Sequence, residues 1–176
     1  MDNPYLTPSS APQAPQPQVT GPPPKLPGVV FGLLITDLVF CCIRGLMFLL
    51  GLLAFAMIAK DDPIYQTAIF ESISAFVIAA AGIPAAILLL KRNNTVGVPL
   101  AWVAALGTVM NIIVGGWQAK IQLVDNPDLE AAGVGGAAMA GAGIMMLIRV
   151  GILITYIVIV LRANKAINSM KANGQI

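Results

Sequence analysis

The sequence predicts an all-α protein: a membrane-spanning four-helix bundle that follows a disordered, proline-rich N-terminal tail. Three observations support this prediction. Hydrophobic residues make up 57% of the chain and charged residues only 10%, whereas an ordinary soluble domain is about 25% charged. Four apolar runs are each long enough to cross a bilayer. Nine of the 13 prolines lie in the first 28 residues, a composition that cannot build a packed core.

The N-terminal tail, residues 1–28, should be cytoplasmic and rich in polyproline II conformation. Two P-x-x-P spacings occur in it, Pro12–Pro15 and Pro24–Pro27. They would suit a proline-recognising module, although such spacings arise easily in this composition. A solvated tail is therefore the favoured interpretation.

The first span is predicted at residues 29–59. Thirty-one helical residues would extend about 46 Å, which exceeds the roughly 30 Å hydrocarbon core, so this helix should tilt or its ends should project into the interfaces. It carries Asp37 and Arg44, seven residues apart and on one helical face. Cys41 and Cys42 are adjacent in it and are interpreted as packing residues.

The other spans are predicted at residues 64–90, 96–119 and 137–161. Pro84 lies inside the second span and should kink it, either as a hinge or as a static bend. Residues 163–176 form a short basic cytoplasmic tail, which should extend the last helix into solvent until about Gly174. The bundle itself thus covers residues 29–162. Four aromatic residues are expected near the membrane interfaces: Tyr65, Trp102, Trp117 and Tyr156.

The distribution of Lys and Arg predicts the orientation. Six of these residues fall on the side of the two termini: Lys25, Lys91, Arg92, Arg162, Lys165 and Lys171. Only Lys60 and Lys120 fall on the opposite side. The positive-inside rule then places both termini in the cytoplasm.

The opening Asn3-Pro4-Tyr5, with Pro8 and the proline-rich run behind it, resembles the leader of uncharacterised small bacterial multi-span membrane proteins. The resemblance implies a location in the bacterial inner membrane. It implies no activity.

Five polar residues inside the predicted spans form the candidate site: Asp37, Arg44, Glu71, Asn111 and Arg149. The charges balance, two against two, and a lone charge in hydrocarbon would be costly. We expect Arg44 to pair with Asp37, directly or through water, and Arg149 to pair with Glu71 across helices, although the partners could be exchanged. Asn111 should form a hydrogen bond across the bundle. The set could be a proton or ion pathway, but the balanced charges and small neighbouring residues favour a structural role.

Composition also limits the function. The chain has no histidine, which excludes His-ligated haem, the usual catalytic zinc sites and a histidine general base. The net charge of +2 is too small to indicate nucleic-acid binding. We therefore expect no catalytic residue, metal or cofactor. The predicted function is a non-enzymatic scaffold or partner-binding subunit, with the lipid bilayer, a second copy or a membrane protein as partner. The alternative is a small transporter or channel that uses the intramembrane charges.

Overall fold

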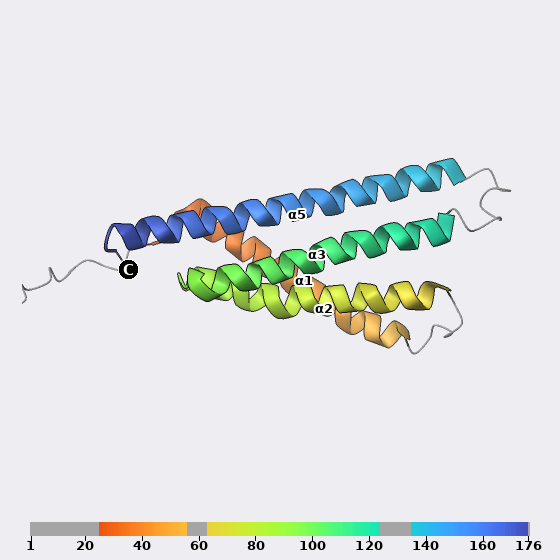
Figure 1. Cartoon of the computed structure of the whole chain (residues 1–176), viewed down its shortest axis with the longest axis horizontal. Coiled ribbons are helices and arrows are strands. Elements are labelled where there is room, and N and C mark those ends of the chain that lie inside the picture. The colour runs from red at the N-terminus through yellow and green to blue at the C-terminus, as the bar shows by residue number, and fades with distance from the viewer. Residues whose placement is uncertain (1–24, 56–62, 124–134, 176) are drawn as a thin grey trace, which may run out of the picture.

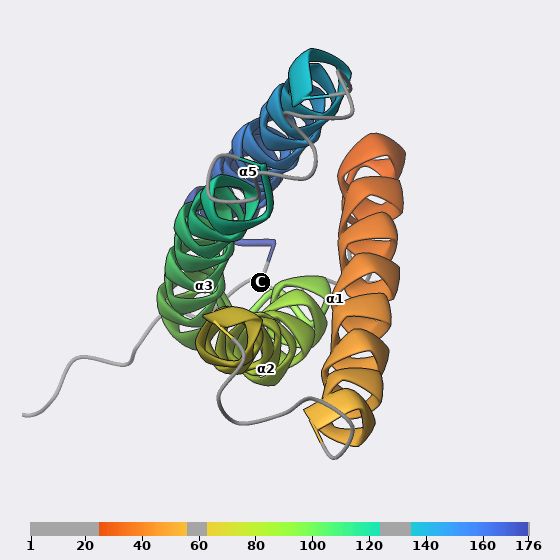
Figure 2. The same cartoon turned by 90° about the vertical axis from the view of Figure 1, so that its right-hand side faces the viewer.

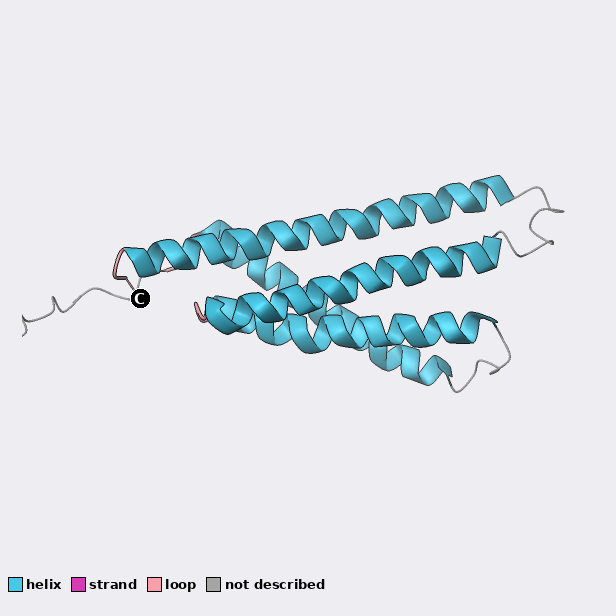
Figure 3. Cartoon of the chain, viewed as in Figure 1, coloured by secondary structure: helices cyan, strands magenta, loops and turns pink. Residues whose placement is uncertain are grey.

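The computed structural model describes residues 25–55, 63–123 and 135–175. These segments form four helices: α1 (Gly28–Phe55), α2 (Pro63–Leu90), α3 (Asn94–Leu123) and α5 (Gly135–Ala172) (Figure 1). Figure 3 shows helices joined by short loops in the described part of the chain, with no strand there. The predicted disordered tail lies almost entirely outside the described residues.

All four helices are long and apolar enough to cross a membrane, so the predicted fold class is confirmed. Each contains a stretch of at least 26 residues that meets this condition, and about 20 suffice for a roughly 30 Å hydrocarbon core. Figure 1 shows α1 inclined to the other three helices.

The helix bounds differ from the predicted spans mainly in the second half of the chain. Helix α3 begins at Asn94 and ends at Leu123, and α5 continues past the predicted span to Ala172, as was expected of the basic tail. The continuation of α5 is not simply solvated. Ala163, Ile167 and Met170 recur on one helical face and are buried because they pack against the start of α1.

The helices follow one another around the bundle in chain order. Helices α2 and α3 pack against each other as a central antiparallel pair, α1 covers α2, and α5 covers α3 (Figure 2). The apolar cluster that joins α1 to α5 lies at one end of the bundle and includes Leu26, Leu34, Ile159 and Ile167. At the other end, where α1 finishes and α5 begins, the two helices lie far apart in both views (Figures 1 and 2). The bundle is therefore open between α1 and α5.

Helix α2 ends in a Schellman motif built on Arg92. The Arg92 N–H donates to the Leu89 carbonyl oxygen at 3.0 Å, and the Asn93 N–H donates to the Leu88 carbonyl oxygen at 2.8 Å. Arg92 has φ 63°, the left-handed conformation that this position of the motif requires and that glycine usually supplies. The same motif ends α5, where Gly174 has φ 63°.

Candidate functional site

Two different polar arrangements occupy the interior of the bundle. One is a connected set of side chains on α2, α3 and α5, made of Glu71, Ser74, Asn111 and Arg149, which we call the polar cluster. The other is a cavity between α1 and α5 that contains Asp37.

The ion pair at the polar cluster is the one expected from the sequence. Arg149 Nη2 lies 3.6 Å from Glu71 Oε1, so the pair links α5 to α2. Arg149 Nη1 also donates to the main-chain carbonyl oxygen of Asn111 on α3, at 3.0 Å. One guanidinium thus contacts two other helices.

Asn111 extends this network toward α2. It is 1% exposed, and its Nδ2 donates to Ser74 Oγ at 3.1 Å. Ser74 in turn donates to the main-chain carbonyl oxygen of Glu71 at 2.7 Å. The expected hydrogen bond of Asn111 across the bundle is confirmed, and its acceptor is the Ser74 hydroxyl.

A glycine makes the contact of Arg149 with α3 possible. A Cβ atom at Gly115 would clash with the Arg149 guanidinium. Gly115 follows Asn111 by one helical turn, so the missing side chain leaves the Asn111 carbonyl oxygen open to a second donor. The residue therefore provides space for a polar contact between helices, in addition to the close packing expected of small residues.

Asp37 and Arg44 form no direct ion pair within the described residues, so of the two contacts expected for them only the one through water stays a prediction. The Arg149–Glu71 contact is the ion pair found within residues 25–55, 63–123 and 135–175. Arg44 instead lies over the Phe40 ring, with its Cζ atom 5.4 Å from the ring centroid. The physical reason is axial separation: seven residues correspond to about 10 Å along a helix, and Phe40 is only one turn from Arg44.

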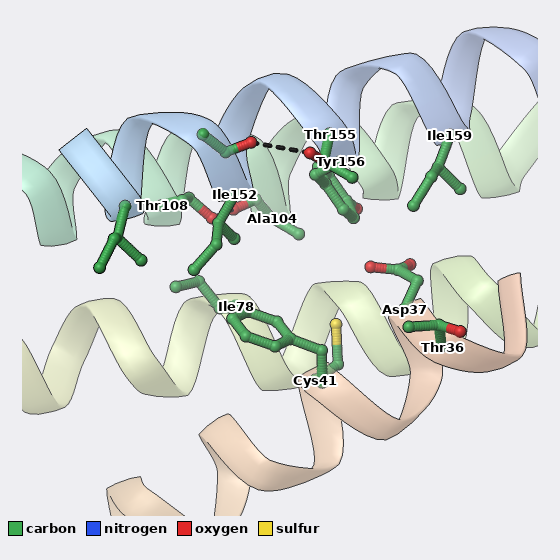
Figure 4. Close-up of a pocket in the computed structure, with 13 residues that line it drawn as sticks. Thr36, Asp37, Cys41, Ile78, Ala104, Thr108, Ile152, Thr155, Tyr156 and Ile159 are labelled. Atoms are coloured by element: carbon green, nitrogen blue, oxygen red, sulfur yellow. Dashed lines mark hydrogen bonds between the residues drawn. The ribbon is translucent and has the colours of Figure 1, made fainter. Parts of the chain in front are cut away.

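Asp37 faces a cavity of about 350 Å³. The walls come from all four helices and include Phe40, Ile78, Ala104 and Ile152. Figure 4 shows the Asp37 carboxyl group directed toward α5, on the side where Tyr156 and Ile159 lie. The cavity opens to the surface between α1 and α5, since Thr36 and Thr155 line it and are exposed.

The polar groups that line this cavity fall into two classes. Three threonine hydroxyls donate to carbonyl oxygens of their own helices: Thr36 to Gly32 at 3.0 Å, Thr108 to Ala104 at 3.1 Å and Thr155 to Gly151 at 2.8 Å. Figure 4 shows the bond of Thr155 as a dashed line. The Tyr156 hydroxyl is buried and has no hydrogen-bond partner within the described residues. Asp37, 6% exposed, likewise has neither an ion pair nor a hydrogen bond there.

Tyr156 is also a correction to the sequence-based prediction. It was expected near a membrane interface, but it lies in the cavity. Because α5 continues to Ala172, Tyr156 is in the interior of that helix and not close to its end.

A second polar network was missed by the sequence analysis. Asn94, at the start of α3, donates from Nδ2 to the Oδ1 atoms of Asn164 and Asn168, at 2.7 Å each. Lys171 Nζ donates to Asn94 Oδ1 at 2.6 Å. Asn164, Asn168 and Lys171 are spaced four and three residues apart, which is the signal of one helical face. That signal fell in a segment assigned to the tail.

The remaining candidate groups offer little reactive chemistry. Both cysteines are free: Cys41 is buried and Cys42 is exposed. Cys41 packs where a Cβ at Gly82 would meet its sulfur, in agreement with a packing role. No group of three or more His, Cys, Asp or Glu residues that could hold a metal occurs in the described part of the chain.

Comparison with protein-family models, with curated proteins and with solved structures finds no match to this chain.

Proposed function

We propose that the protein is a non-enzymatic multi-pass protein of the bacterial inner membrane, with both termini in the cytoplasm, that acts as a scaffold or partner-binding subunit. The observation that carries the proposal is the polar cluster. Its charged and amide groups contact one another: Glu71 with Arg149, Arg149 with Asn111 and Asn111 with Ser74.

Such mutual contacts favour a structural role for the cluster. A group that carries a proton or an ion must exchange partners during transport, and intramembrane acids are candidates for this. Glu71 is opposed by the fixed positive charge of Arg149. The network joins three helices in a medium that gives little hydrophobic drive for helix association. It therefore supports an interpretation in which Glu71 and Arg149 hold α5 against α2 and α3.

The opening between α1 and α5 supports a binding role. A bundle with a purely structural role can fill its interior with side chains, whereas a binding protein keeps a cavity for its partner. Here the cavity reaches the lipid-facing surface between two helices that separate along their length. A partner that enters from the bilayer would meet Asp37 and the Tyr156 hydroxyl.

A second candidate function, a small transporter, is favoured by Asp37 alone. This acid is not opposed by Arg44 and lies in a cavity. In that case the moving part would be the α1–α5 opening, and the polar cluster would remain structural.

Flux measurements in proteoliposomes test the proposal. The wild-type protein should give no proton or cation flux above that of empty liposomes, and Glu71→Gln should lower thermal stability. Flux in the wild type that Glu71→Gln abolishes, with the fold intact, would contradict the proposal. Flux that only Asp37→Asn abolishes would establish the transporter instead.

A further inference from the structure

The cavity between α1 and α5 is lined by one charged residue, Asp37, and otherwise mostly by apolar side chains. Apolar residues that line it around Asp37 include Phe40, Ile78, Ala104 and Ile152. Ligand sites of this kind, largely apolar with a few polar groups, set the orientation of a ligand through those groups. The volume of about 350 Å³ falls within the usual range for small-molecule sites, roughly 300–1,000 Å³.

Among the described residues, no side chain or main-chain group bonds to the Asp37 carboxyl group or the Tyr156 hydroxyl of the cavity. The three threonine hydroxyls are satisfied by their own helices. Asp37 is more than nine-tenths buried and its carboxyl group points into the cavity (Figure 4). A buried polar group without a partner is unfavourable, so these two groups define what a complementary ligand must carry.

The missing partner is a positive charge. Arg44, the cation on the same helix, is held over the Phe40 ring, and Arg149 is held by Glu71 and Asn111. A cation that reaches the cavity would therefore meet an acid with no competing partner. The rings of Phe40 and Tyr156 line the same space and suit a cation, because aromatic faces attract positive charge.

The position of the cavity restricts the ligand further. Asp37 lies nine residues after the start of α1 at Gly28, about 14 Å along the helix, which is near the middle of a bilayer. The mouth lies between two helices, at Thr36 and Thr155, on a surface that faces hydrocarbon. A ligand must therefore be soluble in the bilayer as well as charged.

We propose that the cavity between α1 and α5 binds a lipophilic monovalent cation, whose charge pairs with Asp37 and whose apolar body lies against Phe40, Ile78 and Ile152. The inference rests on the binding role proposed above and names the class of its ligand. A neutral lipid chain or the helix of a second copy could fill the same opening, but neither would supply the charge that Asp37 lacks.

Equilibrium binding of tetraphenylphosphonium to the full-length protein in nanodiscs tests this. Tetraphenylborate, which has the same shape and the opposite charge, is the matched probe. We expect saturable binding of the cation, at least 10-fold weaker binding of the anion, and a loss of affinity of at least 10-fold in Asp37→Asn.

Glu71→Gln provides the control, because it removes another acid of the predicted spans that does not line the cavity. Its affinity for tetraphenylphosphonium should stay within 3-fold of the wild type. Equal binding of both probes, or unchanged affinity in Asp37→Asn, would show an apolar cavity filled by lipid and would overturn the proposal. Self-association in place of cation binding, measured by the oligomeric state in nanodiscs, would overturn it as well. Neither result affects the flux and stability measurements that test the proposed function.

Discussion

Arg149 on α5 donates a hydrogen bond to the main-chain carbonyl oxygen of Asn111 on α3, at 3.0 Å. In a helix that carbonyl oxygen already accepts the N–H of residue 115. It can accept a second donor only if the side chain of residue 115, one turn further along the helix, leaves room for that donor. Residue 115 is glycine. The contact between α3 and α5 thus depends on an absent side chain as well as on a charged one.

Gly115→Ala should therefore destabilise the bundle. The new Cβ would clash with the Arg149 guanidinium, and the arginine would lose its contact with Asn111. We expect the free energy of unfolding in detergent to fall by about 2 kcal/mol, as for other substitutions that overfill a packed site.

Gly143→Ala is the matched control, because a Cβ at that position meets nothing within 4 Å. Alanine is preferred to glycine in helices by about 0.5–1 kcal/mol, so this variant should be neutral or slightly stabilised. Equal effects of the two substitutions would contradict the role assigned to Gly115.

The hydrogen bond between Asn111 and Ser74 should appear as a coupling energy. A double-mutant cycle with Ser74→Ala and Asn111→Ala should give about 0.6 kcal/mol, the typical value for polar contacts between membrane helices. Thr155→Val replaces Ser74→Ala in the control cycle, because the Thr155 hydroxyl bonds to its own helix. The control coupling should fall below about 0.5 kcal/mol, and a larger value would mean that the cycle does not isolate the bond.

The sequence was sufficient for the features that depend on composition and on position along a helix. Four apolar runs predicted four helices. Helices α2 and α5 run in the same direction, and Glu71 and Arg149 each lie in the first half of their helix, so their pairing could be expected. The helical continuation of α5 was expected, but its packing was not: Ala163, Ile167 and Met170 recur at helical spacing and are buried, whereas the nearby Lys and Arg residues led to its assignment as a solvated tail.

The cavity at Asp37 could not be predicted in the same way. It exists because α1 and α5 meet at one end of the bundle and separate toward the other (Figure 2). That separation depends on the angles between helices. The spacing of residues along one helix gives no information about these angles. The direct pairing of Asp37 with Arg44 failed for a related reason: a shared face shows that two residues point the same way, but not that they touch.

Arg92→Gly should stabilise the protein. Arg92 holds φ 63° at the end of α2, a conformation that costs a side-chain-bearing residue about 1–2 kcal/mol. We expect a gain of about 0.5–1 kcal/mol in the free energy of unfolding. Gly174→Ala, at the same position of the motif that ends α5, should have the opposite sign. If Arg92→Gly instead lowers the free energy of unfolding, the charge of Arg92 stabilises the protein by more than its backbone conformation destabilises it.

The proposed orientation predicts which engineered cysteines are labelled from outside the cell. In a background with Cys41→Ala and Cys42→Ala, a membrane-impermeant maleimide should label Lys120→Cys in intact cells. Gln175→Cys should be labelled only after the membrane is opened. The reverse pattern would place both termini outside and would contradict the count of Lys and Arg residues on the two sides.

Asp37→Asn should raise stability in the absence of a ligand. The acid is buried, faces apolar walls and has no ion pair in the described part of the chain. An aspartate at mid-membrane costs about 2.5–3.5 kcal/mol on insertion scales. We expect the neutral amide to recover about 1–2 kcal/mol of this, since it remains polar.

Glu71→Gln should change stability in the other direction, because Glu71 does have a partner and its loss leaves Arg149 unopposed. Thermal unfolding of both variants in the same detergent gives the comparison. The two acids should thus respond with opposite signs, and a loss of stability in Asp37→Asn would mean that Asp37 has a partner within the folded protein.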